Sequence, residues 1–332
     1  MRDVAAVAKV SIKTVSRVVN QEPGVSTELT ERVQDAIRLL GYQHNTTASN
    51  LRRSNQRTLT IGLLLDDVDN PFSSALHRAI EEVAHRHDTL VFAASSDQEA
   101  AREDQLIRAM ASRRVDGLII VPNSASAAGL QQFRHLRRPT VCVDRPAVLP
   151  DVDSVVTDNR AGALTAIHHL AAYGHRRIAF LGDHEAIWTA TERHLGYIEA
   201  LALEGLALDR QLVRQNLRSI AAAEQATLDL LDAEVPPSAL FTGQNLITVG
   251  ALRALQRRGL QQRVALVGFD DFLLADLLTP PVSVIAQNPA AIGQAAAELL
   301  FARLDDNSLP PRQIVIATQL LARGSGEIPA AQ

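Results

Sequence analysis

The fold of the amino-terminal region is decided by residues 10–20, which read Val10-Ser11-Ile12-Lys13-Thr14-Val15-Ser16-Arg17-Val18-Val19-Asn20. A stretch of small residues precedes them, with a tight turn at residues 9–11 in between. Small or apolar side chains recur at helical spacing across this turn, at Val4, Ala5, Ala8, Val10, Val15 and Val18. Two short helices can therefore share one buried face, and the pattern predicts a helix-turn-helix whose other face is free for DNA.

The second predicted helix carries the side chains that would read DNA. Ser11 can cap it by accepting a backbone N–H, while Ile12, Lys13, Ser16 and Arg17 lie near its exposed start. An arginine can donate two hydrogen bonds to one guanine, which gives about 1–3 kcal/mol of discrimination against other bases. Taken alone, the stretch is equally compatible with an ordinary two-helix core that has a solvated basic face.

A third helix follows and makes the DNA-binding interpretation stronger. Its apolar positions recur at helical spacing, at Leu29, Val33, Ala36, Ile37 and Leu40. Ser26 is the expected N-cap and Gly41 the expected end. A polar segment, residues 42–53, comes next and contains one prominent apolar side chain, Leu51, with no visible core to join.

Together these motifs resemble the LacI/GalR family of bacterial repressors, and the resemblance extends over essentially the whole chain. It rests on residues 10–20, Gly41-Tyr42, Asn45, Ala48 and Leu51. The chain departs from the family at two places: Lys9 stands where glycine is usual in the turn, and His44 stands where proline is usual.

The resemblance implies a hinge helix, formed on operator DNA by the segment after the third helix. Its leucine, Leu51 here, would wedge into the minor groove, a general way to kink DNA. Ile12, Lys13 and Arg17 would contact bases. Other residues would contact phosphates, and these contacts position the protein on the DNA without reading its sequence. The remaining DNA-contacting residues are expected to be Ser11, Thr14, Ser16, Asn20, Ser26, Asn45 and Ala48.

Charge divides the chain at about residue 57. Residues 1–57 hold nine Lys/Arg and five Asp/Glu, whereas the rest holds 24 and 32, within a net charge of −4. A cationic head on an anionic body fits phosphate binding at one end. The sequence has no apolar run of membrane-spanning length and no signal-peptide pattern, which predicts a cytoplasmic protein. The resemblance implies that it is bacterial and nucleoid-associated. The single cysteine, Cys142, lies in an apolar run and is expected to be a buried thiol.

Beyond residue 57, short apolar runs alternate with helical patterns. The first series predicts buried parallel strands at 59–65, 89–94, 117–121 and 140–143, with helices near 72–87, 98–113 and 126–137. The second predicts strands at 177–181, 239–242 and 264–269, with helices near 159–173, 190–204, 221–232 and 245–258. A helix near 289–304 and a strand near 312–317 close the chain.

Two such series imply two doubly wound parallel sheets, whose strand ends face a shared cleft. By resemblance, the fold class is an all-α helix-turn-helix head followed by an α/β two-lobed core similar to periplasmic binding proteins. The expected domains are a DNA-binding head at 1–44, a hinge helix and linker at 45–57, and an effector-binding and dimerisation core at 58–332. Lobe 1 would comprise about 58–157 plus 287–316, and lobe 2 about 158–286 plus 317–332.

The resemblance also implies an effector pocket. In lobe 1, Phe72 and Ser73 belong to an Asn-Pro-Phe-Ser motif that would face ligand, and Asp144 ends a predicted strand as the family's acid does. A structural cap is the other reading of Asp144.

In lobe 2, Arg193 belongs to an Arg-x-x-Gly-Tyr motif whose arginine grips ligand oxygens, with Thr189 one helical turn earlier. Asp270 would accept ligand hydroxyls, although its neighbour Asp271 could be only structural. Gln287 lies on a crossover between the lobes.

Two further positions bear on the effector. Gln244-Asn245 stands where the family often has Asn-Asp, and Arg218 lies near a common aromatic position. These changes favour an anionic effector, such as a sugar acid or sugar phosphate, over a plain sugar. Trp188 either supplies a stacking surface instead or is a wall residue on a loop.

The sequence gives little reason to expect catalysis. It has no glycine-rich dinucleotide loop, phosphate-binding loop or nucleophile elbow. His85 with His87, and His168 with His169, have spacings that diverge on a helix, so no metal is expected. No catalytic residue and no cofactor are predicted.

The predicted mechanism is a homodimeric switch. Two heads would read a pseudo-palindromic operator in double-stranded DNA, and an effector closing the cleft would weaken this binding. A corepressor of opposite sign, or an activator, remains compatible with linkage. The alternative from another class is a cytosolic sugar-binding or sugar-modifying protein whose head docks a partner rather than DNA.

Overall fold

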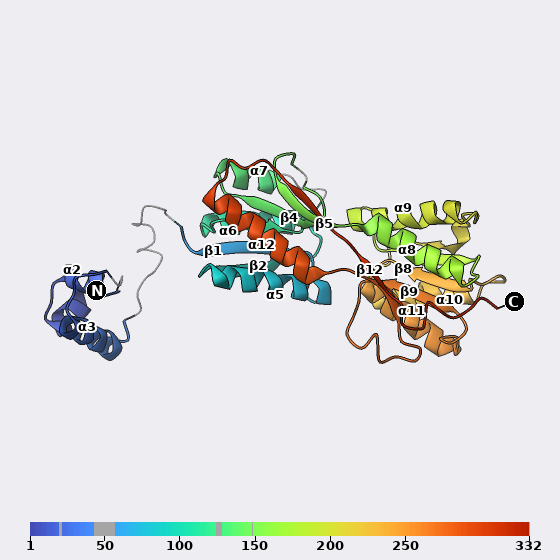
Figure 1. The fold of residues 1–332 in the computed structure, drawn as a ribbon, viewed down its shortest axis with the longest axis horizontal. Helices are drawn as coiled ribbons and strands as arrows, with labels where there is room; N and C mark the ends of the chain where they lie inside the picture. The colour runs from blue at the N-terminus through green and yellow to red at the C-terminus, as the bar shows by residue number, and fades with distance from the viewer. Residues whose placement is uncertain (20–21, 43–56, 124–127, 148, 332) are drawn as a thin grey trace. The chain divides into compact units, whose positions relative to one another are not determined.

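The computed structural model describes residues 1–19, 22–42, 57–123, 128–147 and 149–331. Its contacts divide the chain into two units, Met1–Thr58 and Leu59–Gln332 (Figure 1), and each is described separately.

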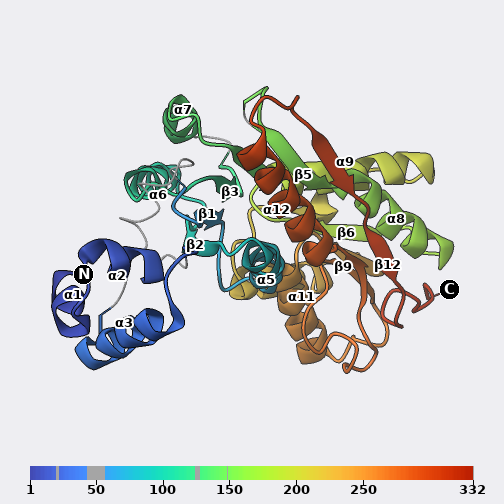
Figure 2. The same cartoon turned by 60° about the vertical axis from the view of Figure 1, so that its left-hand side comes forward.

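The described part of the first unit, the head, contains three helices, α1 (Arg2–Ala8), α2 (Ile12–Val19) and α3 (Thr27–Leu40) (Figure 2). They enclose one small core, formed by Val4, Ala5, Ala8, Val15, Val33 and Ala36. The predicted helix-turn-helix and the third helix are therefore confirmed.

Capping residues set the ends of these helices. Ser11 Oγ accepts the Thr14 N–H at 3.0 Å, and Ser26 Oγ accepts the Leu29 N–H at 3.4 Å. Gly41 ends α3 in the left-handed conformation, with φ 56°. Lys9 ends α1 in the same conformation, with φ 52°, which only glycine adopts without strain.

Lobe 1 of the second unit is built on a six-stranded sheet of order β11-β5-β4-β3-β1-β2, and every pair in it is parallel. Its strands are β1 (Thr60–Leu65), β2 (Leu90–Ser95), β3 (Leu118–Ile120), β4 (Thr140–Asp144), β5 (Asp153–Thr157) and β11 (Gln313–Ile316). Alternate side chains of β1 pack on opposite faces: Leu63 belongs to the cluster with α5 (Pro71–Arg86) and α12 (Pro289–Asp305). Leu64 belongs to the cluster with α6 (Ala100–Ser112) and α7 (Ala128–His135).

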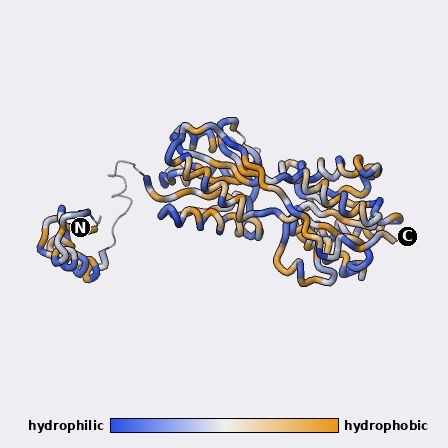
Figure 3. Tube along the Cα trace, in the orientation of Figure 1, coloured by the Kyte–Doolittle hydropathy of each residue, from blue (hydrophilic) through white to orange (hydrophobic). Residues whose placement is uncertain are grey.

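Lobe 2 repeats this plan with the sheet order β12-β10-β9-β8-β6-β7, in which only the β10–β12 pair is antiparallel. Its strands are β6 (Ile178–Leu181), β7 (Val213–Arg214), β8 (Ala239–Thr242), β9 (Ala265–Phe269), β10 (Ser283–Ala286) and β12 (Gln319–Leu321). Helices pack in pairs, α8 (Asn159–Ala172) with α9 (Trp188–Leu203) and α10 (Ile220–Leu231) with α11 (Asn245–Arg258). The colouring of Figure 3 shows apolar segments gathered in the inner strands of both lobes.

Three chain segments connect the lobes, between β5 and α8, between β10 and α12, and between β11 and β12. Strand carboxyl ends of both sheets consequently meet at the junction, as expected for two doubly wound sheets. Gln287 lies on the second segment, where the sequence placed it.

The structure corrects the prediction in two respects. The strand at 89–94 was expected to be buried, but β2 is the edge of its sheet, with Leu90 70% and Phe92 50% exposed. Four strands were not predicted: β5, β7, β10 and β12. β5 shows one reason: its first residue, Asp153, is an acid, which does not look like part of a buried strand in the sequence. In the structure Asp153 is buried because it forms an ion pair with Arg303 at 2.5 Å.

Within the described ranges, no helix combines the length and apolar character needed to cross a membrane.

Candidate functional site

The first candidate site is the outer face of α2 in the head. Val15 is completely buried against the neighbouring helices, whereas Ser11, Ile12 and Lys13 are exposed. Ile12 exposes 48% of its surface at the start of the helix. Thr14, Ser16 and Arg17 are half-buried along the same helix.

Three of the hydroxyl residues predicted to contact phosphate, Ser11, Thr14 and Ser26, lie at or near helix starts, whereas Ser16 lies in the middle of α2. Ser11 and Thr14 join through their hydroxyls at 2.9 Å at the start of α2, and Ser26 caps α3. Helix starts carry free N–H groups and a partial positive charge, both of which favour phosphate.

Arg17 is held within the head itself. Its Nη2 donates to the Pro23 carbonyl at 2.9 Å, and its Nε lies 3.7 Å from Glu22 Oε2. Both contacts are exposed, so a base could replace them at small cost. The other predicted DNA contacts, Asn20, Asn45, Ala48 and Leu51, lie outside the described residues.

The second candidate site is a cavity of about 460 Å³ between the two lobes of the core. All nine residues predicted to bind effector line it: Phe72, Ser73, Asp144, Thr189, Arg193, Arg218, Gln244, Asp270 and Gln287. They lie far apart in the sequence, and the ends of strands and the starts of helices bring them together.

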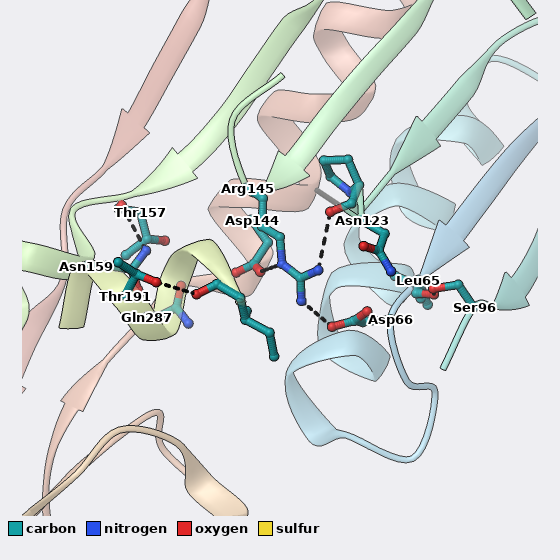
Figure 4. A network of polar contacts seen from close by, with 12 residues as sticks. Leu65, Asp66, Ser96, Asn123, Asp144, Arg145, Thr157, Asn159, Thr191 and Gln287 are labelled. Carbon is teal, nitrogen blue, oxygen red and sulfur yellow. Dashed lines mark hydrogen bonds and ion pairs between the residues drawn. The ribbon is translucent and has the colours of Figure 1, made fainter. Parts of the chain in front are cut away.

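Lobe 1 contributes an arginine held between two acids (Figure 4). The Arg145 guanidinium pairs with Asp66, donates to the Pro122 carbonyl at 3.3 Å, and lies 3.7 Å from Asp144 Oδ2. Burial raises the pKa of Asp144 to about 6, against the opposing effect of Arg145 and Arg193. Asp144 also holds a left-handed backbone, with φ 66°, a strain typical of functional sites.

Lobe 2 contributes a second buried arginine, Arg193 of α9. Its Nε donates to Asn159 Oδ1 at 2.7 Å, and its Nη1 donates to the Gly243 carbonyl at 2.7 Å and lies 3.5 Å from Asp270 Oδ2. The guanidinium also stacks on the Phe269 ring at 3.8 Å. These contacts hold the arginine at the cavity wall with little freedom.

Asp270 connects this arginine to the crossover. Gln287 Nε2 donates to Asp270 Oδ1 at 2.6 Å. The other end of that amide, Gln287 Oε1, is buried and accepts no hydrogen bond from any described residue. It is thus an acceptor that a bound ligand can fill.

A hydrogen bond joins the lobes beside the cavity. Asn245 Nδ2, at the start of α11, donates to Asn70 Oδ1 at 3.1 Å. Asn70 Oδ1 also caps α5 by accepting the Phe72 N–H at 3.0 Å. The closure of the two lobes is therefore coupled to the helix that carries Phe72 and Ser73.

The structure separates the alternatives left open by the sequence. Asp271 turns away from the cavity and forms a two-bond ion pair with Arg323, at 2.7 Å for each bond, so its role is structural. Trp188 is half-buried at the start of α9 and is not part of the cavity lining. Arg218 lines the cavity but is solvent-exposed.

The histidines considered as metal ligands have other contacts. His87 stacks on Phe301 with ring centres 3.9 Å apart, and His168 and His169 pair with Glu204 and Glu327. Among the described residues, no group of three His, Cys, Asp or Glu side chains is arranged to hold a metal ion. Cys142 is a buried thiol, as predicted.

Sequence reasoning missed Asp67 and Asp97 of the cavity, and also three charged residues that lie deeper in it, Asp66, Arg145 and Asp183. Asp66 directly follows β1, Arg145 follows β4, and Asp183 lies two residues after β6. The rule that ligands bind at the carboxyl ends of parallel strands would have found all three.

Comparison with known proteins gives matches at both ends of the chain. Residues 1–45 match the family described as "Bacterial regulatory proteins, lacI family", and residues 167–326 match "Periplasmic binding protein-like domain". The HTH-type transcriptional repressor CytR of Escherichia coli strain K12 is 30% identical over 98% of this chain and 95% of its own length. The ribose operon repressor of Halalkalibacterium halodurans is 30% identical over 97% and 96%.

Solved structures agree with these sequence matches. A Lac repressor dimer bound to operator and the anti-inducer ONPF superposes with a TM-score of 0.85 at 25% identity, covering 98% of both chains. A complex of the transcriptional regulator CelR with cellobiose gives 0.73 at 28% identity, covering 97% of this chain and 98% of the other.

Proposed function

The chain belongs to the lacI family of bacterial regulatory proteins, and on this basis we propose that it represses carbohydrate-uptake or catabolic genes. It binds a pseudo-palindromic operator through its head and leaves it when a small sugar-like effector binds between the lobes. The proposed division is a head at 1–44, a hinge at 45–57 and a core at 58–332. Its place of action is the bacterial cytoplasm, at the nucleoid, and it needs no cofactor, metal or catalytic residue.

The observation that carries this proposal is the face of α2. Ser11, Ile12 and Lys13 are exposed at the start of a helix whose inner residue, Val15, is fully buried. A recognition helix presents its amino-terminal residues to base edges in this way. Ile12, Lys13 and Arg17 read bases, while Ser11, Thr14, Ser16, Asn20 and Ser26 position the backbone.

The operator-bound form is a homodimer, because two half-sites need two heads. Relatives support this assembly, since the Lac repressor structure is a dimer on its operator. In the core, the segment between β9 and β10 exposes two large apolar side chains, Leu273 (83% exposed) and Leu277 (73% exposed). Leu51 of each hinge, together with Asn45 and Ala48, contacts the centre of the operator.

The cavity between the lobes is the effector site. Asp144 and Asp270 accept hydroxyl hydrogen bonds, Arg193 contacts ligand oxygens, and Phe72 supplies an apolar surface. The relatives include a ribose operon repressor and a regulator bound to cellobiose, which supports a sugar-like ligand. Because Asn245 of lobe 2 is hydrogen-bonded to Asn70 of lobe 1, a ligand that changes lobe closure also acts on lobe 1, which follows the hinge in the sequence.

Selection of bound duplexes from random DNA, with the full chain, tests the proposal. We expect an enriched sequence with two inverted half-sites, whose binding weakens steeply as salt increases. The Leu51→Ala variant should lose affinity for this sequence while keeping its salt-sensitive binding to unrelated DNA. Absence of any enriched sequence would favour the alternative in which the head docks a protein partner.

A further inference from the structure

The charge of the cavity is the starting point. Six aspartates line it, against three arginines. They are Asp66, Asp67, Asp97, Asp144, Asp183 and Asp270, with Arg145, Arg193 and Arg218. Even when every arginine is counted against one acid, three negative charges remain.

The two buried arginines of the cavity are occupied by the protein. Arg145 pairs with Asp66 and a backbone carbonyl, and Arg193 engages Asn159, a second carbonyl and Asp270. An anionic ligand would have to compete with these partners for the charge of either guanidinium. The remaining cation, Arg218, is exposed and lies outside this buried network.

Acids from opposite lobes face each other across the cavity. Asp144 of lobe 1 is repelled by Asp270 of lobe 2, and Asp183 of lobe 2 is repelled by Asp66 of lobe 1. Burial is the main cause that raises the pKa of both Asp144 and Asp183; these like charges add to it, and Arg145 and Arg193 oppose it. A positive charge placed between the lobes relieves both repulsions at once.

The buried polar atoms that remain unused are mainly acceptors. Asp66 Oδ1 and Gln287 Oε1 are buried and accept no hydrogen bond from the described part of the chain. Arg145 Nε is the corresponding unused donor, but it already faces the Asp144 carboxylate at 3.7 Å. A ligand that completes this cavity therefore brings hydrogen-bond donors. A protonated amine brings up to three donors and one positive charge, and it brings no acceptor.

From this arrangement we infer that the effector is a polyhydroxylated amine, whose ammonium group binds among the carboxylates of Asp66, Asp144, Asp183 and Asp270. Its hydroxyl groups use the remaining acceptors and Arg193. This inference rests on the proposed function, because it names the ligand class of the same cleft. It replaces the anionic effector that Arg218 and Gln244-Asn245 had suggested, since Arg218 is exposed whereas Asp144 and Asp270 are buried.

Matched pairs of probes, differing only in the amine, test the inference. Tris(hydroxymethyl)aminomethane and pentaerythritol form one pair, and D-glucosamine and D-glucose form another, with N-acetyl-D-glucosamine as the uncharged amide. D-glucuronate and D-glucose 6-phosphate represent anions. Thermal unfolding of the full chain in an amine-free buffer at pH 7 ranks them, and calorimetry gives the dissociation constants.

We expect the amine of at least one pair to bind at least tenfold more tightly than its neutral partner and than either anion. The Asp183→Asn variant, which is isosteric, should lose this preference. The matched control is Asp271→Asn, because Asp271 pairs with Arg323 and is not part of the cavity lining. This variant should keep the preference.

Two results would overturn the inference. One is a neutral or anionic probe that binds as tightly as its amine, and the other is the absence of a shift with every amine. Operator binding by the same samples, measured separately, distinguishes this failure from failure of the proposed function. A chain that binds its operator but prefers glucose or glucuronate would keep its function and lose only the ligand class.

Discussion

Asp144 and Asp270 occupy matching positions in the two lobes, at the carboxyl ends of β4 and β9. Both hold a left-handed backbone, with φ 66° and 69°, and both have an arginine within 3.7 Å, Arg145 for the first and Arg193 for the second. The two lobes thus present the same local structure to the cavity from opposite sides. A ligand between them meets a carboxylate and a guanidinium on each wall.

The Asp270→Asn variant is expected to fold, because asparagine tolerates the left-handed conformation better than most residues do. It should nonetheless weaken the binding of the effector by about 1.5–3 kcal/mol, since a hydrogen bond to a charged group is lost. Calorimetry measures this change. Asp271→Asn is the matched control, because Asp271 pairs with Arg323 away from the cavity, and it should leave effector affinity unchanged.

Glu103 of α6 is fully buried in lobe 1, where its Oε2 accepts the Asn123 N–H at 2.8 Å. Burial raises the pKa of Glu103 from 4.5 to about 7. The folded chain therefore binds more protons than the unfolded chain between these values, so its stability falls as the pH rises through this window and changes no further above it.

We accordingly expect the ligand-free chain to gain unfolding free energy from Glu103 when the pH falls from 8 to 5.5. The Glu103→Gln variant should show a smaller rise in melting temperature over that interval. Glu298→Gln, which changes an exposed glutamate, should behave like the unmodified chain. Identical pH profiles for the unmodified chain and Glu103→Gln would contradict the assignment.

Lys9 ends α1 with a left-handed backbone, which costs a residue with a side chain about 1 kcal/mol or more. Lys9→Gly should stabilise the head by about 1 kcal/mol, slowing hydrogen exchange of its core amides about fivefold. Lys9→Ala removes the same charge but keeps the Cβ atom, so it should give no such gain. Equal protection in the two variants would show that the charge, and not the backbone, matters.

Glu22 lies 3.7 Å from Arg17 and competes with DNA for it. Exposed pairs of this kind contribute about 0.2–1 kcal/mol, so Glu22→Gln should raise operator affinity about two- to fivefold. Glu28→Gln removes an equal charge from the first turn of α3 and serves as the control. If both variants gained equally, general electrostatics would explain the result and Glu22 would have no specific effect on Arg17.

Local signals made much of the fold predictable. Helical spacing and the caps at Ser11, Ser26 and Gly41 gave the head, and the apolar runs gave the central strands. The exposure of a strand was harder to predict from the sequence. β2 is exposed because it lies at the edge of its sheet, and that position depends on the order in which the strands are arranged. The short strands β7 and β12 contain two and three residues, too few for any periodic pattern.

The sequence predicted many of the residues that line the cavity, but it did not predict the cavity's net negative charge. Motif resemblance found residues such as Asp144 and Arg193, but the pairing of Arg145 with Asp66 joins positions 79 residues apart in the sequence. Only the packed strands bring those ends together. The rule for strand ends could have named acids such as Asp66 and Asp183 as candidates, but the pairing that leaves a surplus of acids is seen only in the structure.

Sequence-specific DNA binding by the head is the central claim, and Arg17 tests it most directly. Fluorescence anisotropy of the full chain measures affinity for the selected operator and for a scrambled duplex at the same salt concentration. We predict a preference for operator of about 10³-fold or more, which Arg17→Ala lowers by about 1–3 kcal/mol while binding to the scrambled duplex changes little. Equal affinity of the unmodified chain for the two duplexes would contradict the account.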